Sequence, residues 1–340
     1  MKQVIIIAEA GVNHNGSIEL AKKLVDSAVS AGADYVKFQT FKAEKLVSKY
    51  AIKAEYQLTN FKDNDSTQFS MLKKLELSDQ MHVELISYCK KVGVKFMSTG
   101  FDEESINYLD ELGLNIFKIP SGEITNKPYL QLIAKKGKPV LLSSGMAYLY
   151  EIEDAIKVMI DEGLSIDDIT VLHCNTEYPT PMQDVNLKAM LRIRDTLKVK
   201  VGYSDHTKGI EISIAAVALG AQVIEKHFTL DRTLPGPDHK ASLEPNELKL
   251  LISAIRNVEK ALMGSGNKEP SQSEMKNRII VRKSIHTSKF ITKGKLLTKE
   301  DLIALRPGIG ISPMEINKVI GKISRTELAK GSIINWEDLL

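Results

Sequence analysis

Two runs of the sequence decide the fold: Val199-Lys-Val-Gly-Tyr-Ser-Asp-His206 and Gln222-Val-Ile-Glu-Lys-His227. Each run has the composition of a strand and ends in a histidine, and residues 209–220 between them have the composition of a helix. This order predicts two parallel neighbouring strands, whose carboxyl ends meet at one edge of a sheet. We therefore expect the two imidazoles to converge on a metal site with an open coordination sphere. Two unrelated structural histidines are the alternative.

The same alternation runs through about the first 260 residues of the chain. Strand-like runs lie at residues 4–8, 35–38, 95–98, 116–119, 140–142, 170–172, 200–203 and 223–225. Helix-like stretches lie between them, for example at residues 20–31, 151–161 and 246–263. Eight such units predict an α/β fold, the TIM (β/α)8 barrel, whose active sites lie at the carboxyl ends of the strands. A doubly wound sheet is the alternative fold.

Most of the predicted strands end in a side chain capable of chemistry. These side chains are Glu9, Lys37, Gln39, Lys118, Ser143, His173, Ser204, His206, Glu225 and His227. A barrel rim with a purely structural role does not need two lysines and two histidines at one mouth. The pattern therefore predicts a functional site at this end of the barrel.

Lys37 and Lys118 are flanked by apolar residues, and a buried lysine is costly without an anionic partner. They indicate a phosphate or carboxylate ligand. A Schiff-base aldolase with a nucleophilic lysine, or a lysine paired with a local acid, remains an alternative. Ser121, Ser143 and Ser204 follow strand ends, where small residues let backbone amides approach an anion.

Glu9 and Glu123 are candidate acid/base or hydroxyl-binding groups. A stiff turn, Pro235-Gly-Pro-Asp-His239, presents Asp238 after the eighth strand, although a plain turn is an equally good reading. Structural roles are expected for the remaining histidines in the sequence that lack a supporting motif, namely His14, His82 and His286.

Composition excludes several classes of protein. The formal net charge of +3 does not suit a bulk nucleic-acid binder. No apolar run approaches the roughly 20 residues of a membrane span, and the N-terminal segment lacks the length of a secretory signal. Two cysteines, Cys89 and Cys174, make no disulfide framework and are expected to be buried. We expect a reduced, cytoplasmic protein.

The composition changes after Gly264, where a stretch rich in Gly, Ser and Pro is typical of a linker. The sequence predicts a barrel at residues 1–265, a linker at 266–280 and a small, mostly β or irregular domain at 281–340. About sixty residues are marginal for independent stability. The small domain is therefore expected to pack on a barrel, either its own or that of a second subunit.

Several motifs resemble the sialic acid synthases, that is, N-acetylneuraminate synthase and its relatives that make legionaminic acid. The motifs are Ala8-Glu-Ala-Gly-Val-Asn-His-Asn-Gly16, Val36-Lys-Phe-Gln-Thr40, Lys118-Ile-Pro-Ser-Gly-Glu123, His173-Cys-Asn-Thr-Glu-Tyr-Pro-Thr-Pro181, Gly202-Tyr-Ser-Asp-His206, Ile224-Glu-Lys-His-Phe-Thr229 and Gly236-Pro-Asp238. The segment around Leu305-Arg-Pro-Gly308 resembles the antifreeze-like (SAF) domain of these enzymes. The resemblance runs essentially from end to end.

The resemblance implies that phosphoenolpyruvate condenses with an N-acylated mannosamine. His206 and His227 would hold a divalent metal, Mn²⁺ in the first place and Mg²⁺ or Co²⁺ otherwise. Phosphoenolpyruvate would be bound by Lys37, Lys118, Ser121, Ser143 and Ser204, with Thr176 nearby. The sugar would be held by Gln39, Glu123, Tyr178 and Asp238. Arg306 would reach the N-acyl group from the partner subunit, which implies a domain-swapped homodimer.

In the implied reaction the metal polarises the sugar aldehyde, C3 of phosphoenolpyruvate attacks it, and Glu9 helps to deprotonate the water that adds to C2. The expected product is N-acetylneuraminate from N-acetylmannosamine. The alternative is N,N'-diacetyllegionaminate from 2,4-diacetamido-2,4,6-trideoxymannose. Three positions depart from the family pattern: Gly100, Ser144 and Thr176. A non-enzymatic sugar- or ice-binding protein is the remaining alternative.

Overall fold

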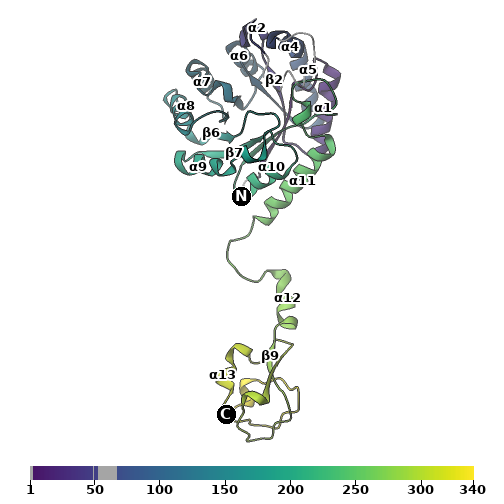
Figure 1. Cartoon of the computed structure of the whole chain (residues 1–340), viewed down its shortest axis with the longest axis vertical. Helices are drawn as coiled ribbons and strands as arrows, with labels where there is room; N and C mark the ends of the chain where they lie inside the picture. Colours follow the sequence, from purple (N-terminus) through teal and green to yellow (C-terminus); the bar gives the residue numbers. More distant parts are fainter. Residues whose placement is uncertain (1–2, 49, 53–66) are drawn as a thin grey trace. The chain divides into compact units, whose positions relative to one another are not determined.

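The computed structural model describes residues 3–48, 50–52 and 67–340. The chain divides into two compact units, Met1–Met263 and Gly264–Leu340 (Figure 1). The first unit contains the eight parallel strands that the sequence predicts, and the second contains the segment that resembles the SAF domain. Each unit is described by itself below.

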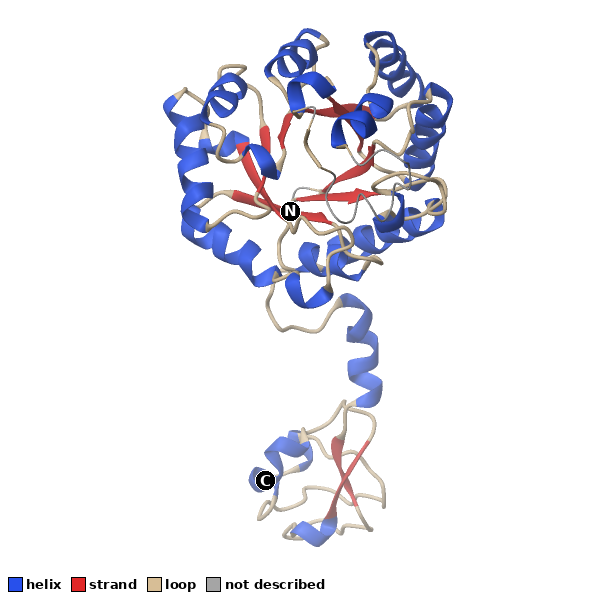
Figure 2. Ribbon diagram, turned by 45° about the horizontal axis from the view of Figure 1, so that its top comes forward, coloured by secondary structure: helices blue, strands red, loops and turns tan. Residues whose placement is uncertain are grey.

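The first unit is a nearly closed parallel barrel (Figure 2). Its strands are β1 (Ile5–Gly11), β2 (Tyr35–Thr40), β3 (Lys95–Gly100), β4 (Phe117–Ile119), β5 (Val140–Ser143), β6 (Ile169–His173), β7 (Lys200–Asp205) and β8 (Val223–His227). Hydrogen bonds join them in the order β3-β2-β1-β8-β7-β6-β5-β4. β3 and β4 lie next to each other and complete the ring. The predicted TIM-type fold is confirmed, and the doubly wound alternative is wrong.

Helices follow the strands and surround them. They are α1 (Ile18–Ala31), α2 (Ala43–Leu46), α4 (Gln68–Leu75), α5 (Asp79–Val92), α6 (Glu103–Glu111), α7 (Lys127–Ala134), α8 (Leu149–Asp161), α9 (Leu187–Leu197), α10 (Glu211–Ala218) and α11 (Pro245–Ala261). α1 illustrates why they form. The Ser17 side chain accepts the amide of Leu20 and starts the helix, and Gly32 ends it in the left-handed region.

The interior of the barrel is filled by an apolar layer. Its buried members are Ile7, Met97, Leu141, Leu172 and Val223. Successive side chains of a strand alternate between its faces, so the residue two positions further on points to the same side. For four of these five residues, the residue two positions further along the strand is polar. The barrel is therefore closed by apolar packing below and lined by chemically active groups at its carboxyl end.

The second unit contains α12 (Gln272–Val281), α13 (Ile316–Val319) and an antiparallel pair, β9 (Ser284–Thr287) with β10 (Leu302–Leu305). Its core consists of Ile285, Ile291, Leu297, Leu302, Ile311, Val319, Leu328, Ile334 and Leu339. The segment predicted as a linker thus contains a helix, whose capping box at Ser271 and Glu274 starts it. Within the described ranges, no helix is both long and apolar enough to cross a membrane.

Candidate active site

A cavity of about 240 Å³ lies at the carboxyl ends of the barrel strands. It brings together most of the residues that the sequence predicts for the site. The predicted residues that line it are Glu9, Lys37, Gln39, Lys118, Ser121, Ser143, Thr176, Tyr178, Ser204, His206 and His227. They come from β1, β2, β4, β5, β7 and β8 and from segments that follow strands, so the barrel topology assembles them.

A buried network of charges forms the floor of the cavity. Lys37 Nζ lies 2.7 Å from Glu9 Oε2 and 3.5 Å from Glu225 Oε2. Lys118 Nζ lies 3.6 Å from Glu225 Oε1, which also accepts a hydrogen bond from Ser204 Oγ at 2.8 Å. Lys37 Nζ further donates to Thr99 Oγ1 at 2.9 Å. Each lysine therefore has an acidic partner, while both remain at the wall of an open cavity.

The two carboxyl groups of this network differ strongly in acidity. Burial raises the pKa of Glu9 to about 7, against the attraction of Lys37, and the nearby Glu225 charge raises it further. Burial acts on Glu225 in the same direction, but Lys118 and Lys37 outweigh it and hold the pKa of Glu225 at about 2. Glu225 is thus the permanent counterion of the lysines. Glu9 exchanges its proton near neutral pH, as a general acid or base requires.

The two lysines differ as well. Burial disfavours a charged Lys37, but Glu225 and Glu9 outweigh it and raise the pKa of Lys37 above its ordinary value. Burial lowers the pKa of Lys118, against the attraction of Glu225. An anion in the cavity would compensate the charge of Lys118, which among the described residues has one carboxylate, that of Glu225, within ion-pair distance.

The imidazoles of His206 and His227 face each other across the cavity with ring centroids 5.6 Å apart. The Nδ1 of His206 donates to the carbonyl of Asn175 at 2.5 Å, so its Nε2 carries the lone pair, with Ser204 Oγ 3.4 Å away. The Nδ1 of His227 is buried without a hydrogen-bond partner. Burial lowers the pKa of His206 to about 4 and that of His227 well below its ordinary value, so both rings are neutral.

Two neutral imidazoles, one with an orphaned nitrogen, fit a divalent cation as nitrogen ligands. Asp238 Oδ2 lies 3.9 Å from His227 Nδ1. Within residues 3–48, 50–52 and 67–340, no group of three or more His, Cys, Asp or Glu side chains forms a candidate metal cluster. The geometry suits a site in which protein supplies few ligands and leaves positions for water or substrate.

The loop that carries Asp238 is fixed by buried hydrogen bonds. His239 Nδ1 pairs with Thr229 Oγ1 at 2.7 Å, and Ser242 Oγ donates to the Asp238 carbonyl at 2.7 Å. Asp238 itself is buried, and burial raises its pKa to about 6. The predicted turn therefore places Asp238 beside His227, although Asp238 is not among the residues that line the cavity.

The loop after β5 contacts a predicted phosphate-binding serine. Ser121 Oγ accepts the amide of Gly145 at 3.0 Å and lies 3.3 Å from Cys174 Sγ. A Cβ on Gly145 would come within 2.7 Å of Ser121 Oγ, so only glycine fits there. Gly100 is tightly packed too, because a Cβ there would lie 2.9 Å from Ile106.

Some predicted residues lie outside the cavity. Glu123 is half-buried and accepts a hydrogen bond from Asn126 at 2.6 Å, and Arg306 is exposed on the second unit. His173 ends β6 but bonds the Val185 carbonyl at 2.9 Å instead of lining the cavity. His82 is structural as expected, since Ser78 and Thr40 occupy its two ring nitrogens.

Sequence reasoning gave no role to Glu225 and missed Thr99. Glu225 lies two residues before His227 on β8, so strand alternation puts both on the inner face. The sequence places Glu225 at this strand end, and its spacing from His227 could have assigned it a role in the site. Thr99 lies one residue before the end of β3, and its role depends on the reach of the Lys37 side chain from the neighbouring strand β2.

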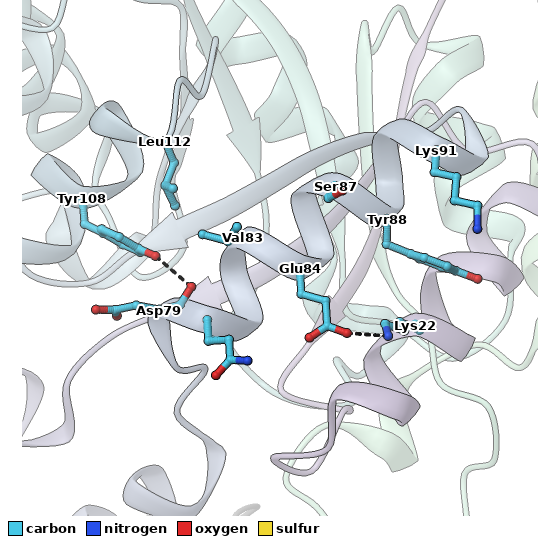
Figure 3. A pocket seen from close by; sticks show the side chains of 10 residues that line it. Lys22, Asp79, Val83, Glu84, Ser87, Tyr88, Lys91, Tyr108 and Leu112 are labelled. Atoms are coloured by element: carbon cyan, nitrogen blue, oxygen red, sulfur yellow. Dashed lines mark hydrogen bonds and ion pairs between the residues drawn. The ribbon is translucent and has the colours of Figure 1, made fainter.

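A larger groove lies elsewhere, on the outer surface (Figure 3). It is lined mainly by α5, with Lys22 from α1 and Tyr108 from α6. Its polar groups already bind one another: Lys22 Nζ lies 2.6 Å from Glu84 Oε1, and the Tyr108 hydroxyl donates to the Asp79 carbonyl. None of the predicted site residues lines it, so size does not identify the active site.

A TIM-type barrel with buried lysines, carboxylates and imidazoles at its carboxyl edge, followed by a small separate unit, defines the class of protein. The sequence matches the NeuB family over residues 24–268 and the SAF domain over residues 282–340. The chain belongs to the NeuB family.

Two relatives are similar over nearly the whole chain. The N,N'-diacetyllegionaminic acid synthase of Campylobacter jejuni is 55% identical over 98% of this chain and 99% of its own length. The enzyme of the same name from Legionella pneumophila is 51% identical over 98% of this chain and 94% of its own length. A solved structure, the N-acetylneuraminic acid synthetase of Leptospira borgpetersenii, has a TM-score of 0.72 and 36% identity over 81% of this chain and 90% of that one. These relatives indicate a synthase-type enzyme of sialic-acid-like sugars.

Proposed function

We propose that the protein condenses phosphoenolpyruvate with 2,4-diacetamido-2,4,6-trideoxymannose to give N,N'-diacetyllegionaminate and phosphate. The observation that carries the choice of sugar is the identity of 55% and 51% to two N,N'-diacetyllegionaminic acid synthases over nearly the full chain. The expected acceptor, N-acetylmannosamine, is therefore replaced by its alternative. The two sugars differ at C4 and C6, where a few pocket contacts decide between them.

The charge network supports phosphoenolpyruvate as the donor. Lys37 and Lys118 are buried at the cavity wall with Ser121, Ser143 and Ser204 beside them. Burial strengthens the attraction between a lysine and a phosphate or carboxylate, because water screens it less. In this arrangement the lysines bind the charges of the donor and form no covalent bond to it. Glu225 keeps them charged before the donor arrives.

His206 and His227 would hold a divalent cation, Mn²⁺ in the first place, through the Nε2 of His206 and the unpartnered Nδ1 of His227. When bound, such a cation supplies Lewis-acid polarisation of the sugar aldehyde. Glu9 is close to Lys37 and has a pKa of about 7, so it can accept a proton from the water that adds to C2. Tyr178 packs against His206 with tilted rings at a centroid distance of 4.1 Å.

The test is phosphate release from phosphoenolpyruvate with Mn²⁺, measured with each of the two sugars in parallel and with product masses determined. The proposal expects a much higher kcat/KM for the diacetamido sugar. A preference for N-acetylmannosamine would overturn the assignment of the acceptor but keep the chemistry. Release with neither sugar would overturn the proposed function.

We also propose that the second unit completes the site of a partner subunit through Arg306. Arg306 is exposed and its guanidinium can bind an N-acyl carbonyl oxygen. Complementation tests this swap with two inactive variants, Glu9→Gln and Arg306→Ala. In a swapped dimer, half of the mixed molecules are heterodimers with one intact site of two, so about a quarter of the wild-type activity returns. Mixing that restores nothing, although mass spectrometry detects heterodimers, would contradict the swap.

A further inference from the structure

A buried ion pair lies directly behind the two imidazoles. Asp205 and Lys226 are partners in the register of β7 and β8, and each immediately precedes one of the histidines His206 and His227. Lys226 Nζ lies 3.0 Å from Asp205 Oδ2, and both side chains are almost completely buried. Because side chains alternate along a strand, this pair faces the helix layer while both histidines face the cavity.

Asp205 is held from several sides. It accepts hydrogen bonds from the Thr207 amide at 2.9 Å, from Thr207 Oγ1 at 2.7 Å and from Ser213 Oγ of α10 at 2.6 Å. Lys226 Nζ also donates to the Thr207 carbonyl at 2.5 Å. The residues on both sides of His206 are thus tied down, Asp205 by its carboxylate to β8 and α10 and Thr207 by its carbonyl to β8.

A contribution to folding stability does not explain well why the chain has such a buried ion pair. A buried ion pair is often no more stabilising than apolar residues of the same volume. Attraction of a metal cation does not explain the pair either, because the ammonium of Lys226 lies next to His227 and repels a cation. What the pair does provide is a fixed distance between the ends of two strands, since charge-assisted hydrogen bonds restrict both groups in length and direction.

We infer that the Asp205–Lys226 pair is a positioning element that sets the separation of the His206 and His227 imidazoles for divalent-metal binding. The inference rests on the metal site proposed above. The two histidines supply the protein nitrogens, and the ion pair behind them determines whether both can reach one ion. Groups of this kind, which orient metal ligands without touching the metal, typically contribute roughly 10- to 100-fold to metal affinity.

The first variant is the double substitution Asp205→Asn with Lys226→Met in the full-length chain. It removes one negative and one positive charge, so the net charge near the site is unchanged and electrostatic attraction of the cation is preserved. We expect the Kd for Mn²⁺, measured by electron paramagnetic resonance of free Mn²⁺, to rise roughly tenfold or more. The Kd for phosphoenolpyruvate without metal, measured by calorimetry, should stay within about twofold, since Lys37 and Lys118 are untouched.

A milder variant tests the same role with less risk of a folding defect. Ser213→Ala removes one hydrogen bond to Asp205 without changing any charge. Ser105→Ala is its matched control, because Ser105 is a buried helix serine that donates to Asp102 at 2.7 Å after β3, far from either imidazole in the barrel order. Ser213→Ala should weaken Mn²⁺ binding severalfold and change the spectrum of bound Mn²⁺, while Ser105→Ala should do neither.

The outcomes separate the two proposals. If wild-type protein binds no Mn²⁺, the proposed metal site fails and this inference with it. If wild type binds Mn²⁺ and the variants bind it equally well, the metal site stands and the positioning role is refuted. A fall in melting temperature with parallel loss of Mn²⁺ and phosphoenolpyruvate binding would indicate a general structural role and would also refute it.

Discussion

The acidity of Glu9 leads to an unusual prediction: Glu9→Gln should make the metal-free protein more stable at neutral and alkaline pH. Burial raises the pKa of Glu9 from its ordinary value of 4.5 to about 7. One pH unit corresponds to about 1.4 kcal/mol, so ionised Glu9 costs the folded chain about 3 kcal/mol relative to the neutral side chain. Glutamine resembles the neutral form and avoids this cost.

The sign of the pH dependence follows from the same values. A raised pKa in the folded state means that Glu9 destabilises the fold progressively as pH rises from the unfolded value toward the folded one. At pH 8 the full gain of about 3 kcal/mol from Glu9→Gln is expected, whereas at pH 5 it should be below about 1 kcal/mol. The same substitution should strongly reduce phosphate release, since Glu9 is then unable to accept a proton.

Urea unfolding of metal-free protein at pH 5 and pH 8 measures this difference. Far-UV circular dichroism is the suitable probe because the barrel contains most of the helices, whereas the chain has a single tryptophan, Trp336, in the second unit. Glu123→Gln is the matched control, since Glu123 is half-buried and should change stability by less than about 0.5 kcal/mol. Equal stability of Glu9→Gln and wild type at pH 8, or a gain that does not depend on pH, would refute the reasoning.

Three further predictions concern the same cavity. Glu225→Gln should destabilise the fold by about 3 kcal/mol at pH 7, because the pKa of Glu225 is lowered from 4.5 to about 2. Urea titrations at several pH values should show this loss of stability disappear as the pH falls from about 4.5 toward 2. His206→Ala and His227→Ala should each abolish the Mn²⁺-dependent part of phosphate release, and undiminished Mn²⁺-dependent turnover would contradict their role. Borohydride with pyruvate should leave no added mass on Lys37 or Lys118, whereas a trapped adduct would restore the Schiff-base alternative.

The barrel itself could be predicted from the sequence because its strands are buried on both faces and are therefore short apolar runs separated by helices. The predicted runs lie within one residue of the observed strand starts, as for Tyr35–Thr40 and Lys200–Asp205. Several strand ends were predicted too early, as at Gly11 and Asp205. The polar residues that end these strands break the apolar pattern although they continue the hydrogen-bonded ladder.

The sequence predicts which residues form the site but not which of them form ion pairs with one another. The strand-end rule places Glu9, Lys37 and Glu225 at one edge, yet it does not say which acid partners which lysine. That depends on which carboxylate both lysines reach. Glu225 lies within ion-pair distance of Lys37 and of Lys118, which lower its pKa to about 2, whereas Glu9 forms its ion pair with Lys37 and burial raises its pKa to about 7. The sequence did not predict α12 for a different reason. This helix has no buried face, so its sequence lacks the periodic apolar stripe that marks an amphipathic helix.

The charges of the cavity explain why donor and cation should act together. At pH 7, Lys37 and Lys118 are charged, Glu225 is ionised and Glu9 is near half-ionised. The net charge of these side chains in the metal-free cavity is therefore close to zero. A donor carrying phosphate and carboxylate charges adds negative potential and pushes the pKa of Glu9 upward, away from the ionised form that accepts a proton. Positive charge at His227, the register partner of Glu9 on the next strand, acts in the opposite direction. A cation held by His206 and His227 would therefore lower the pKa of Glu9 and leave Glu9 able to accept a proton while the donor is bound.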